Sequence, residues 1–250
     1  MSIIYEINPP KIPRGGKLSE EQIDSLLVTL KERVASIADF CDGIHITESV
    51  LGIARVSPIT TGEILKKLHP KLKITISMRT IDKDFESIIH FIDRAIVSKF
   101  DGVLVLKGDP SQENPSDSGL APSEVIMKLK EAKRADRINL YLSLPSKPNF
   151  EKIKKKVNAK PVGFMTQVIH STDQVSRICD ELKPKGFGII PCVLLPSEKN
   201  SKSAEFLKLD WSSYKDRIND FVNEIHKIAG DVLITSPNDF ALAKDVLGKL

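Results

Sequence analysis

The sequence has few aromatic residues and few cysteines. Its 250 residues include one Trp and three Tyr, and the net charge is only +4, so a surface that stacks single-stranded nucleic acid is not expected. Cys41, Cys179 and Cys192 form neither a CxxC pair nor an even framework, which indicates a reducing compartment. The chain shows no signal-peptide pattern and no apolar run of membrane-spanning length. We therefore expect a cytoplasmic protein that binds neither nucleic acid nor a membrane.

Common catalytic and cofactor motifs are also missing. His69, His90, His170 and His226 fall on separate segments without HxxxH or HxH spacing, and no metal site is expected. The sequence contains no GxSxG nucleophile elbow, no GxGxxG dinucleotide fingerprint and no GxxxxGK[ST] phosphate loop. These absences count against an α/β-hydrolase, a Rossmann-type dinucleotide site and a P-loop NTPase.

What the sequence does contain is a regular alternation of short apolar runs and segments with helical spacing. Continuous apolar, β-branched runs are typical of strands that are covered on both faces, as in a parallel sheet. The expected strands are Ile3–Ile7, Gly43–Thr47, Lys73–Met78, Gly102–Leu106, Ile138–Leu144, Val162–Val168, Gly186–Leu194 and Asp231–Thr235. The expected helices are Ser19–Asp39, Thr60–Leu68, Asp82–Ser98, Ser123–Lys133, Phe150–Ala159, Ser171–Leu182, Trp211–Ala229 and Asn238–Leu247.

Eight βα units in a chain of this length predict a (β/α)8 TIM barrel that forms a single domain over residues 1–250. Ser19, followed by Glu20 and Gln22, predicts a capping box at the start of the first helix, and Ser171 offers a cap to the sixth. A doubly wound open sheet is the alternative, but no GxGxxG follows any strand. In a barrel, the functional residues are expected at the C-terminal ends of the strands.

Glu6 is the most informative residue among these strand ends. It lies within the first expected strand, between Tyr5 and Ile7, and burying a carboxylate without a partner is costly. One interpretation is an outward-facing or salt-bridged side chain. The other is a carboxylic acid whose pKa is raised by burial, so that it can donate a proton to a substrate.

Other strand ends present small polar groups. Thr47 and Ser77 could contact a ligand through their hydroxyl groups, or they could be ordinary loop residues. Asp109 either caps its own loop or faces the site, and Gln167 offers both a donor and an acceptor to a heterocycle. The polar segment 194–206 after the seventh strand could act as a lid.

Five segments, taken together, resemble the methylenetetrahydrofolate reductase family in order and spacing over nearly the whole chain. "YEINPPK" is similar to the family's "FEFFPPK", and "LKGDP" is similar to its "LRGDP". The segments are Tyr5–Lys11, Leu106–Pro110, Lys154–Val168 ("KKKVNAKPVGFMTQV"), Gly186–Pro196 ("GFGIIPCVLLP") and Val232–Gly248 ("VLITSPNDFALAKDVLG").

The resemblance implies a flavin-containing barrel that reduces 5,10-methylenetetrahydrofolate with electrons from NAD(P)H. It implies that Glu6 is the general acid on the pterin, that Asp109 stabilises the iminium cation and tunes the flavin, and that Gln167 positions the substrate. The residues that it implies for binding FAD are Thr47, Ser77, Leu106, Lys107, Gly108, Asp109 and Lys156.

Departures from the family pattern leave alternatives open. The family's "HLTC" and "YPxxHP" segments, which hold the flavin, correspond here to Ser77–Thr80 and Leu144–Pro148, without either histidine. FAD held in another way, FMN, or no flavin at all would each fit this pattern, and the folate could be a modified pterin. A methyltransferase that uses a tetrahydropterin and a flavin-less subunit of a reductase complex are the alternative functions. A homo- or hetero-oligomer also stays open.

Overall fold

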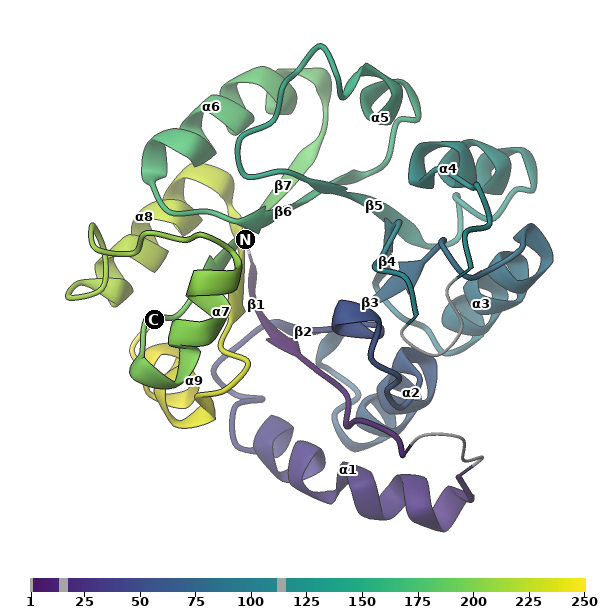
Figure 1. The fold of residues 1–250 in the computed structure, drawn as a ribbon, viewed down its shortest axis with the longest axis horizontal. Coiled ribbons are helices and arrows are strands. Elements are labelled where there is room, and N and C mark those ends of the chain that lie inside the picture. The colour runs from purple at the N-terminus through teal and green to yellow at the C-terminus, as the bar shows by residue number, and fades with distance from the viewer. Residues whose placement is uncertain (1, 14–17, 112–115) are drawn as a thin grey trace.

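Parallel strands close into a barrel in the computed structural model, which describes residues 2–13, 18–111 and 116–250. In Figure 1 the strands occupy the centre and the helices surround them. Each strand pairs with the next, and the last pairs with the first, which confirms the predicted (β/α)8 barrel. The strands are β1 (Ser2–Ile7), β2 (Gly43–Ile46), β3 (Lys73–Arg79), β4 (Gly102–Leu106), β5 (Asn139–Leu144), β6 (Gly163–Val168), β7 (Gly188–Leu194) and β8 (Asp231–Thr235).

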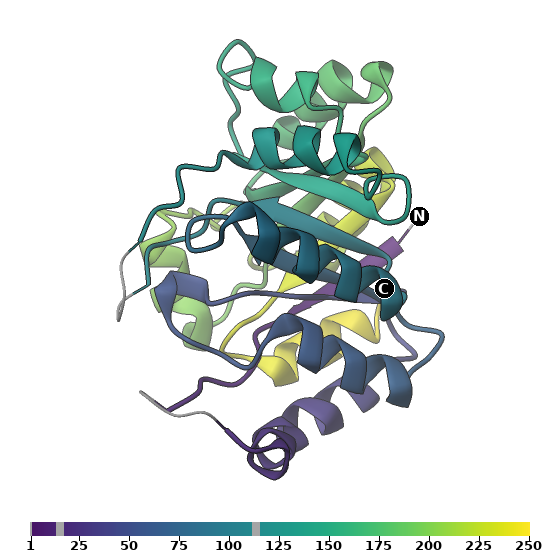
Figure 2. The ribbon, with the colours of Figure 1, turned by 90° about the vertical axis from the view of Figure 1, so that its right-hand side faces the viewer.

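The α-helices cover the outside of the barrel, and α2, α3 and α4 stack along one flank (Figure 2). None of the helices in the described residues is long and apolar enough to cross a membrane. Their bounds are α1 (Glu20–Ala35), α2 (Pro58–Leu68), α3 (Phe85–Val97), α4 (Pro122–Glu131), α5 (Lys154–Asn158), α6 (Thr172–Leu182), α7 (Ser201–Phe206), α8 (Ile218–Ala229) and α9 (Phe240–Leu247). Three short 3-10 turns are η1 (Val50–Gly52), η2 (Lys183–Lys185) and η3 (Glu198–Asn200).

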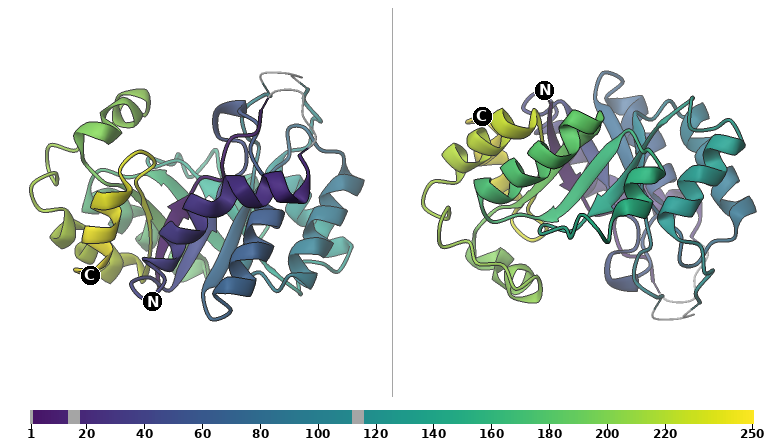
Figure 3. Two further views of the ribbon diagram at one scale, coloured as in Figure 1. Left: turned by 90° about the horizontal axis from the view of Figure 1, so that it is seen from below. Right: turned by 90° about the horizontal axis from the view of Figure 1, so that it is seen from above.

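The loop between β7 and α8 contains the additional helix α7. Figure 3 shows α7 at the same end of the barrel as η1, and both follow the C-terminal end of a strand. The sequence predicted this segment as a polar loop. The short helix forms because Ser197 caps η3, with its hydroxyl accepting from the Asn200 backbone N–H, and α7 follows directly.

Two predicted helix starts coincide with a capping box. Ser19 and Gln22 form a capping box at α1, and Ser171 and Gln174 form another at α6. Three predicted starts are wrong. The third helix was expected from Asp82, but Asp84 caps it and α3 begins at Phe85. Residues 150–153 and 211–217 form turns rather than helix, so α5 and α8 begin later than the periodicity indicates. Neither α5 nor α8 has a side-chain cap on its first turn. Without a cap, periodicity alone does not mark where a helix begins.

Alternation along the strands divides the core into two parts. Tyr5 and Ile7 of β1 face the large core between the barrel and its helices, whereas Ile4 faces the barrel interior. The interior cluster comprises Ile4, Leu104, Met165, Ile190, Cys192 and Leu233. Successive side chains of a strand point to opposite faces, so Glu6 lies on the same interior face as Ile4, one step nearer the C-terminal end.

Candidate active site at the mouth of the barrel

A small cavity opens at the C-terminal end of the barrel, directly above the interior apolar cluster. Its volume is about 220 Å³, below the range of roughly 300–1,000 Å³ that is typical of sites for drug-sized ligands. The side chains that line it are Glu6, His45, Thr47, Glu48, Ser49, Val50, Ser77, Arg79, Leu104, Leu106, Gly108, Asp109, Met165, Thr166, Cys192 and Leu233. The cavity therefore combines an apolar floor with a polar rim from the first four strands.

Glu6 is the titratable group at the edge of the apolar floor. Thr235, the last residue of β8, donates a hydrogen bond from its hydroxyl to Glu6 Oε1 at 2.7 Å. Burial raises the pKa of Glu6 above its usual value, and the opposing effect of the Thr235 hydrogen bond is smaller. Of the two interpretations of Glu6, the inward-facing carboxyl is therefore correct, and no cation forms a salt bridge with it among the described residues.

Arg79 is a buried cation on the interior face of β3. Its side chain is 2% exposed, and Nη2 donates to Asp82 at 2.6 Å while Nη1 donates to the Ser49 carbonyl at 3.2 Å. Its Nε is buried and finds no hydrogen-bond partner in the part of the chain that the structure describes. A buried donor without a partner is rare in proteins. Arg79 thus lines the cavity with a guanidinium that is paired with Asp82.

Two further carboxylates line the cavity, and they differ in their contacts. Glu48 accepts hydrogen bonds from Lys83 Nζ at 2.7 Å and from the Arg79 backbone N–H at 2.6 Å. Both oxygens of its carboxylate therefore have a partner within the protein. Asp109 is exposed at the rim. Glu6 and Asp109 are therefore the two carboxyl groups of this cavity that remain available for proton transfer.

His45 is buried within β2 and has both ring nitrogens engaged. Nδ1 lies 2.9 Å from Thr75 Oγ1 and Nε2 lies 2.9 Å from Ser77 Oγ. Burial lowers the pKa of His45 to about 4, so the ring is neutral at neutral pH. This is the arrangement of a packing histidine whose hydrogen bonds are satisfied.

The depressed pKa of His45 predicts a loss of stability in acid. The unfolded chain binds a proton at the ordinary pKa near 6.5, whereas the folded chain does so only near 4. The contribution of neutral His45 to the free energy of unfolding is complete above the pKa of the unfolded chain. It declines by about 3 kcal/mol in all as the pH falls from near 6.5 to near 4. Urea unfolding across the window measures it. His45→Gln should flatten this decline, whereas the exposed control His90→Gln should leave it unchanged; equal slopes for wild type and His45→Gln would contradict the assignment.

The predicted cofactor residues Thr47, Ser77, Leu106 and Gly108 do meet at this cavity. Thr47 donates to Asn8 Oδ1 at 2.6 Å, and the Ser77 hydroxyl is the partner of His45. The hydroxyl groups of Thr47 and Ser77 are thus already used within the protein.

The remaining predicted residues do not line the cavity. Lys107 is exposed and forms a salt bridge of 2.7 Å with Asp117. Lys156 is partly buried, donates to the Ser143 carbonyl at 2.5 Å, and has a pKa lowered by burial. Gln167 is exposed and lies outside the lining of the cavity. Of the predicted catalytic residues, the structure therefore brings together Glu6 and Asp109 but not Gln167.

Two residues near Glu6 were not predicted from the sequence: Arg79 lines the cavity, and Thr235 lies outside its lining but donates a hydrogen bond to Glu6. Glu6 was identified as a charged residue within a largely apolar strand. Arg79, at the end of β3, gives the same signal and could have been found in the same way. Thr235 gave no such signal, because a threonine at a strand end is common. Its place beside Glu6 follows from the pairing of β1 with β8.

Gly108 has a structural role at this cavity. Its φ is +81°, and a Cβ there would lie 2.7 Å from Arg79 Cγ and 2.9 Å from Cδ. Gly108→Ala should therefore destabilise the fold by about 2–3 kcal/mol, combining left-handed strain with a displaced arginine. Gly186→Ala is the matched control, since Gly186 has φ +87° with nothing within 4 Å, and should cost only about 1 kcal/mol. Equal losses in urea unfolding would show that the Arg79 contact is unimportant.

No protein-family model matches the chain, and no curated protein matches it. Solved structures do match. An oxaloacetate acetylhydrolase has a TM-score of 0.60 and 11% identity, with 99% of this chain and 79% of that chain covered. A 2,3-dimethylmalate lyase, described as a PEP mutase/isocitrate lyase superfamily member, has a TM-score of 0.55 and 10% identity, with 99% and 78% covered. At this identity, the likeness shows the fold.

These comparisons overturn the family resemblance. The assignment to the methylenetetrahydrofolate reductase family is wrong, and with it the reduction of a methylene-tetrahydropterin, the FAD or FMN, and the NAD(P)H. The physical reason is that the similar motifs lie where local geometry restricts the residues. Gly108 in "LKGDP", for example, has φ +81° and lies close to the Arg79 side chain. Lys156 donates a hydrogen bond to the Ser143 carbonyl. Both residues are therefore explained by the fold.

In residues 2–13, 18–111 and 116–250, no three His, Cys, Asp or Glu side chains gather closely enough to hold a metal ion. The three cysteines are free thiols. Burial raises the pKa of Cys192, which lines the cavity, well above its usual value, and the nearby Glu6 adds to the effect. Cys192 is thus an inert apolar neighbour of Glu6 rather than a nucleophile.

Proposed function

We propose that this chain is an enzyme that cleaves a carbon–carbon bond in a small organic acid at the mouth of the barrel, with Glu6 as the proton donor. The observation that carries the proposal is the pairing of a carboxyl of raised pKa, Glu6, with a buried cation, Arg79, in one small cavity. A carboxyl whose pKa is raised by burial, in the same cavity as an arginine, suits a substrate that is an anion and receives a proton.

The chemistry assigns one role to each group. A base removes the proton of a hydroxyl group, the carbon–carbon bond breaks as that carbon becomes a carbonyl, and the bonding electrons pass to the carbon next to the carboxylate. That carbon then takes a proton. In this proposal Asp109 at the rim is the base, Arg79 holds the carboxylate, and Glu6 delivers the proton.

Two facts support this substrate class. The cavity of about 220 Å³ suits a small molecule. The solved structures with this fold carry names that refer to oxaloacetate and 2,3-dimethylmalate, which are both small dicarboxylic acids. Because their identity to this chain is low, the names suggest a class of compound to test and not a substrate.

The test is a panel of small hydroxy and keto acids, including malate, 2,3-dimethylmalate and oxaloacetate. Proton NMR in deuterium oxide would follow the appearance of a carbonyl product and the incorporation of deuterium next to the carboxylate. Turnover of at least one acid, with deuterium at that carbon, is the expected result. An absence of both binding and turnover across the panel would contradict the proposal.

We also propose a cytoplasmic location and a single domain over the whole chain. Free thiols at Cys41, Cys179 and Cys192 support a reducing compartment. The closed barrel supports one folding unit, because each strand needs both neighbours to complete its hydrogen bonds. Limited proteolysis that released a stable fragment smaller than the barrel would contradict the single domain.

A further inference from the structure

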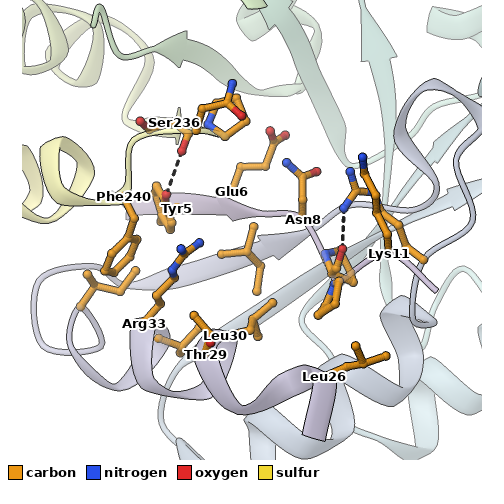
Figure 4. Close-up of a pocket in the computed structure, with 18 residues that line it drawn as sticks. Tyr5, Glu6, Asn8, Lys11, Leu26, Thr29, Leu30, Arg33, Ser236 and Phe240 are labelled. Carbon is orange, nitrogen blue, oxygen red and sulfur yellow. Dashed lines mark hydrogen bonds between the residues drawn. The ribbon is translucent and has the colours of Figure 1, made fainter. Parts of the chain in front are cut away.

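A second and larger cavity lies on the other side of β1, between that strand, α1 and the start of α9. Its volume is about 450 Å³. Figure 4 shows Glu6 rising from β1 on the side away from α1, whereas Arg33 reaches from α1 toward Tyr5 and Phe240. The cavity is therefore lined mainly by groups that the barrel-mouth reaction does not use.

Three cations line this cavity, and none has an acidic partner. Lys11 follows β1, Arg33 projects from α1, and Arg55 precedes α2. No carboxylate lies within salt-bridge distance of any of them in the part of the chain that the structure describes. Arg33 stands over the Phe240 ring, with 5.3 Å from its guanidinium carbon to the ring centroid.

Arg55 is the best positioned of the three. Its Nη1 donates to the Pro9 carbonyl at 2.6 Å, which holds the side chain in place. Its Nε is buried without a hydrogen-bond partner among the described residues. Burial lowers the pKa of Arg55, as expected for a guanidinium whose charge is not neutralised nearby. Arg55 thus lines the cavity with a guanidinium that could form charge-assisted hydrogen bonds with an anion.

The rest of the lining offers no competing negative charge. Glu6 is the one carboxyl group on it, and burial raises its pKa. Burial also raises the pKa of Tyr5, whose hydroxyl donates to the Ser236 carbonyl. On the α1 side, Leu26 and Leu30 provide apolar surface, so the cavity combines an apolar wall with positively charged side chains.

We infer that this cavity binds an organic anion, a carboxylate or phosphate attached to an apolar body, with Arg55 holding the charged group and Arg33 adding positive charge to the wall. The apolar body packs on Leu26, Leu30 and Phe240. Glu6 lines both cavities, but the arginines and the apolar wall of this site lie outside the lining of the barrel-mouth cavity. Charge-assisted hydrogen bonds to a guanidinium are the strongest that a neutral-pH site can offer to such a group.

The probes are octanoate, octyl phosphate, inorganic phosphate and the uncharged 1-octanol. Binding is followed in the whole protein by methyl NMR, because leucine methyl groups mark the two cavities independently: Leu26 and Leu30 line the second cavity, and Leu104 and Leu233 line the barrel mouth. Octanoate or octyl phosphate should shift the Leu26 and Leu30 signals, and comparison of the two shows which headgroup is preferred.

Variants then test the role of charge. Arg55→Gln should weaken binding of the better probe about tenfold, and Arg33→Gln, on an exposed helix face, should weaken it without affecting folding. Arg137→Gln, an exposed arginine outside the cavity, should leave binding unchanged.

Three results would overturn the inference: shifts confined to Leu104 and Leu233, equal binding of 1-octanol, or full affinity in both arginine variants. Loss of the barrel-mouth reaction in Glu6→Gln, with binding of the probe retained, would separate this site from the proposed function. Loss of probe binding in Arg55→Gln, with turnover at the barrel mouth retained, would also show that the second cavity acts independently of the proposed function.

Discussion

Glu6→Gln is expected to lower kcat by at least about 100-fold on any acid turned over at the barrel mouth, since proton transfer from a positioned group contributes about 10²–10⁴-fold. Glutamine keeps the size of the side chain and can still accept the hydrogen bond from Thr235. It cannot donate a proton to carbon. Because the shape of the cavity is preserved, KM should change far less than kcat. Steady-state kinetics on wild type and variant measure both constants.

The same variant should change how stability depends on pH. Burial raises the pKa of Glu6 in the folded state, so the folded chain binds its proton more tightly than the unfolded chain. The stability from this group is complete below the ordinary pKa of a glutamic acid and is lost as the pH rises through the raised folded value. Urea unfolding from mildly acidic to mildly alkaline pH should show this decline in wild type and not in Glu6→Gln.

Glu21→Gln, on the exposed face of α1, is the matched control and should leave both turnover and the pH dependence as in wild type. Two outcomes would contradict the role of Glu6. Turnover at the wild-type rate in Glu6→Gln would exclude it as the proton donor. An identical alkaline decline in both proteins would show that its carboxyl is ionised in the folded state.

Arg79→Met is expected to have the second largest effect, on both stability and activity. Arg79 is 2% exposed and is paired with Asp82, and its backbone N–H binds Glu48. Removing one partner of a buried pair leaves the other uncompensated, which costs about 3–5 kcal/mol. Asp82 is partly exposed and also lies 3.5 Å from Lys83, so about 3 kcal/mol is the appropriate expectation. Loss of the charge should also raise KM for an acid substrate.

Arg79→Lys separates these two effects. Lysine restores the charge but not the forked guanidinium, so it should recover part of the stability and little of the affinity for a carboxylate. Arg94→Met serves as the control, because Arg94 pairs with Glu63 at the surface and should cost less than about 1 kcal/mol. Urea unfolding and KM measurements report the two quantities. An Arg79→Met variant with wild-type KM would remove Arg79 from the substrate site.

Much of the architecture could be predicted from local patterns. The eight apolar runs match the eight strands to within about two residues, because a run of β-branched residues in a parallel sheet is determined by burial on both faces. Ser19 and Ser171 marked their helix starts correctly, since capping is a local interaction. α5 and α8, which lack such caps, were placed too early. Strand number and the barrel then followed from the alternation.

Glu6 was also identified from the sequence alone, because a carboxyl in an apolar strand is informative without any knowledge of its neighbours. Which residues share its cavity could not be predicted in the same way. Asp109 and Gln167 both follow strands, yet Asp109 lines the cavity and Gln167 lies outside it. The register between β6 and β7 shifts between Met165 and Val168, and a shift of one residue moves a side chain to the other face of a sheet.

The family resemblance failed for a related reason. Motifs such as "LKGDP" are short, and their residues are constrained by turns at strand ends, so similar strings arise in barrels that do different chemistry. By itself, the sequence determined the strands and most of the helices, and it indicated Glu6 as a carboxyl within an apolar strand, because these depend on periodicity within single segments. The tertiary structure decided that the Glu6 side chain faces inward. Only the tertiary structure decided that Arg79 and Thr235 join Glu6 and that a second, positively charged cavity lies behind β1. Those neighbours come from strands and helices far apart in the chain, and their contacts are set by barrel closure and strand register.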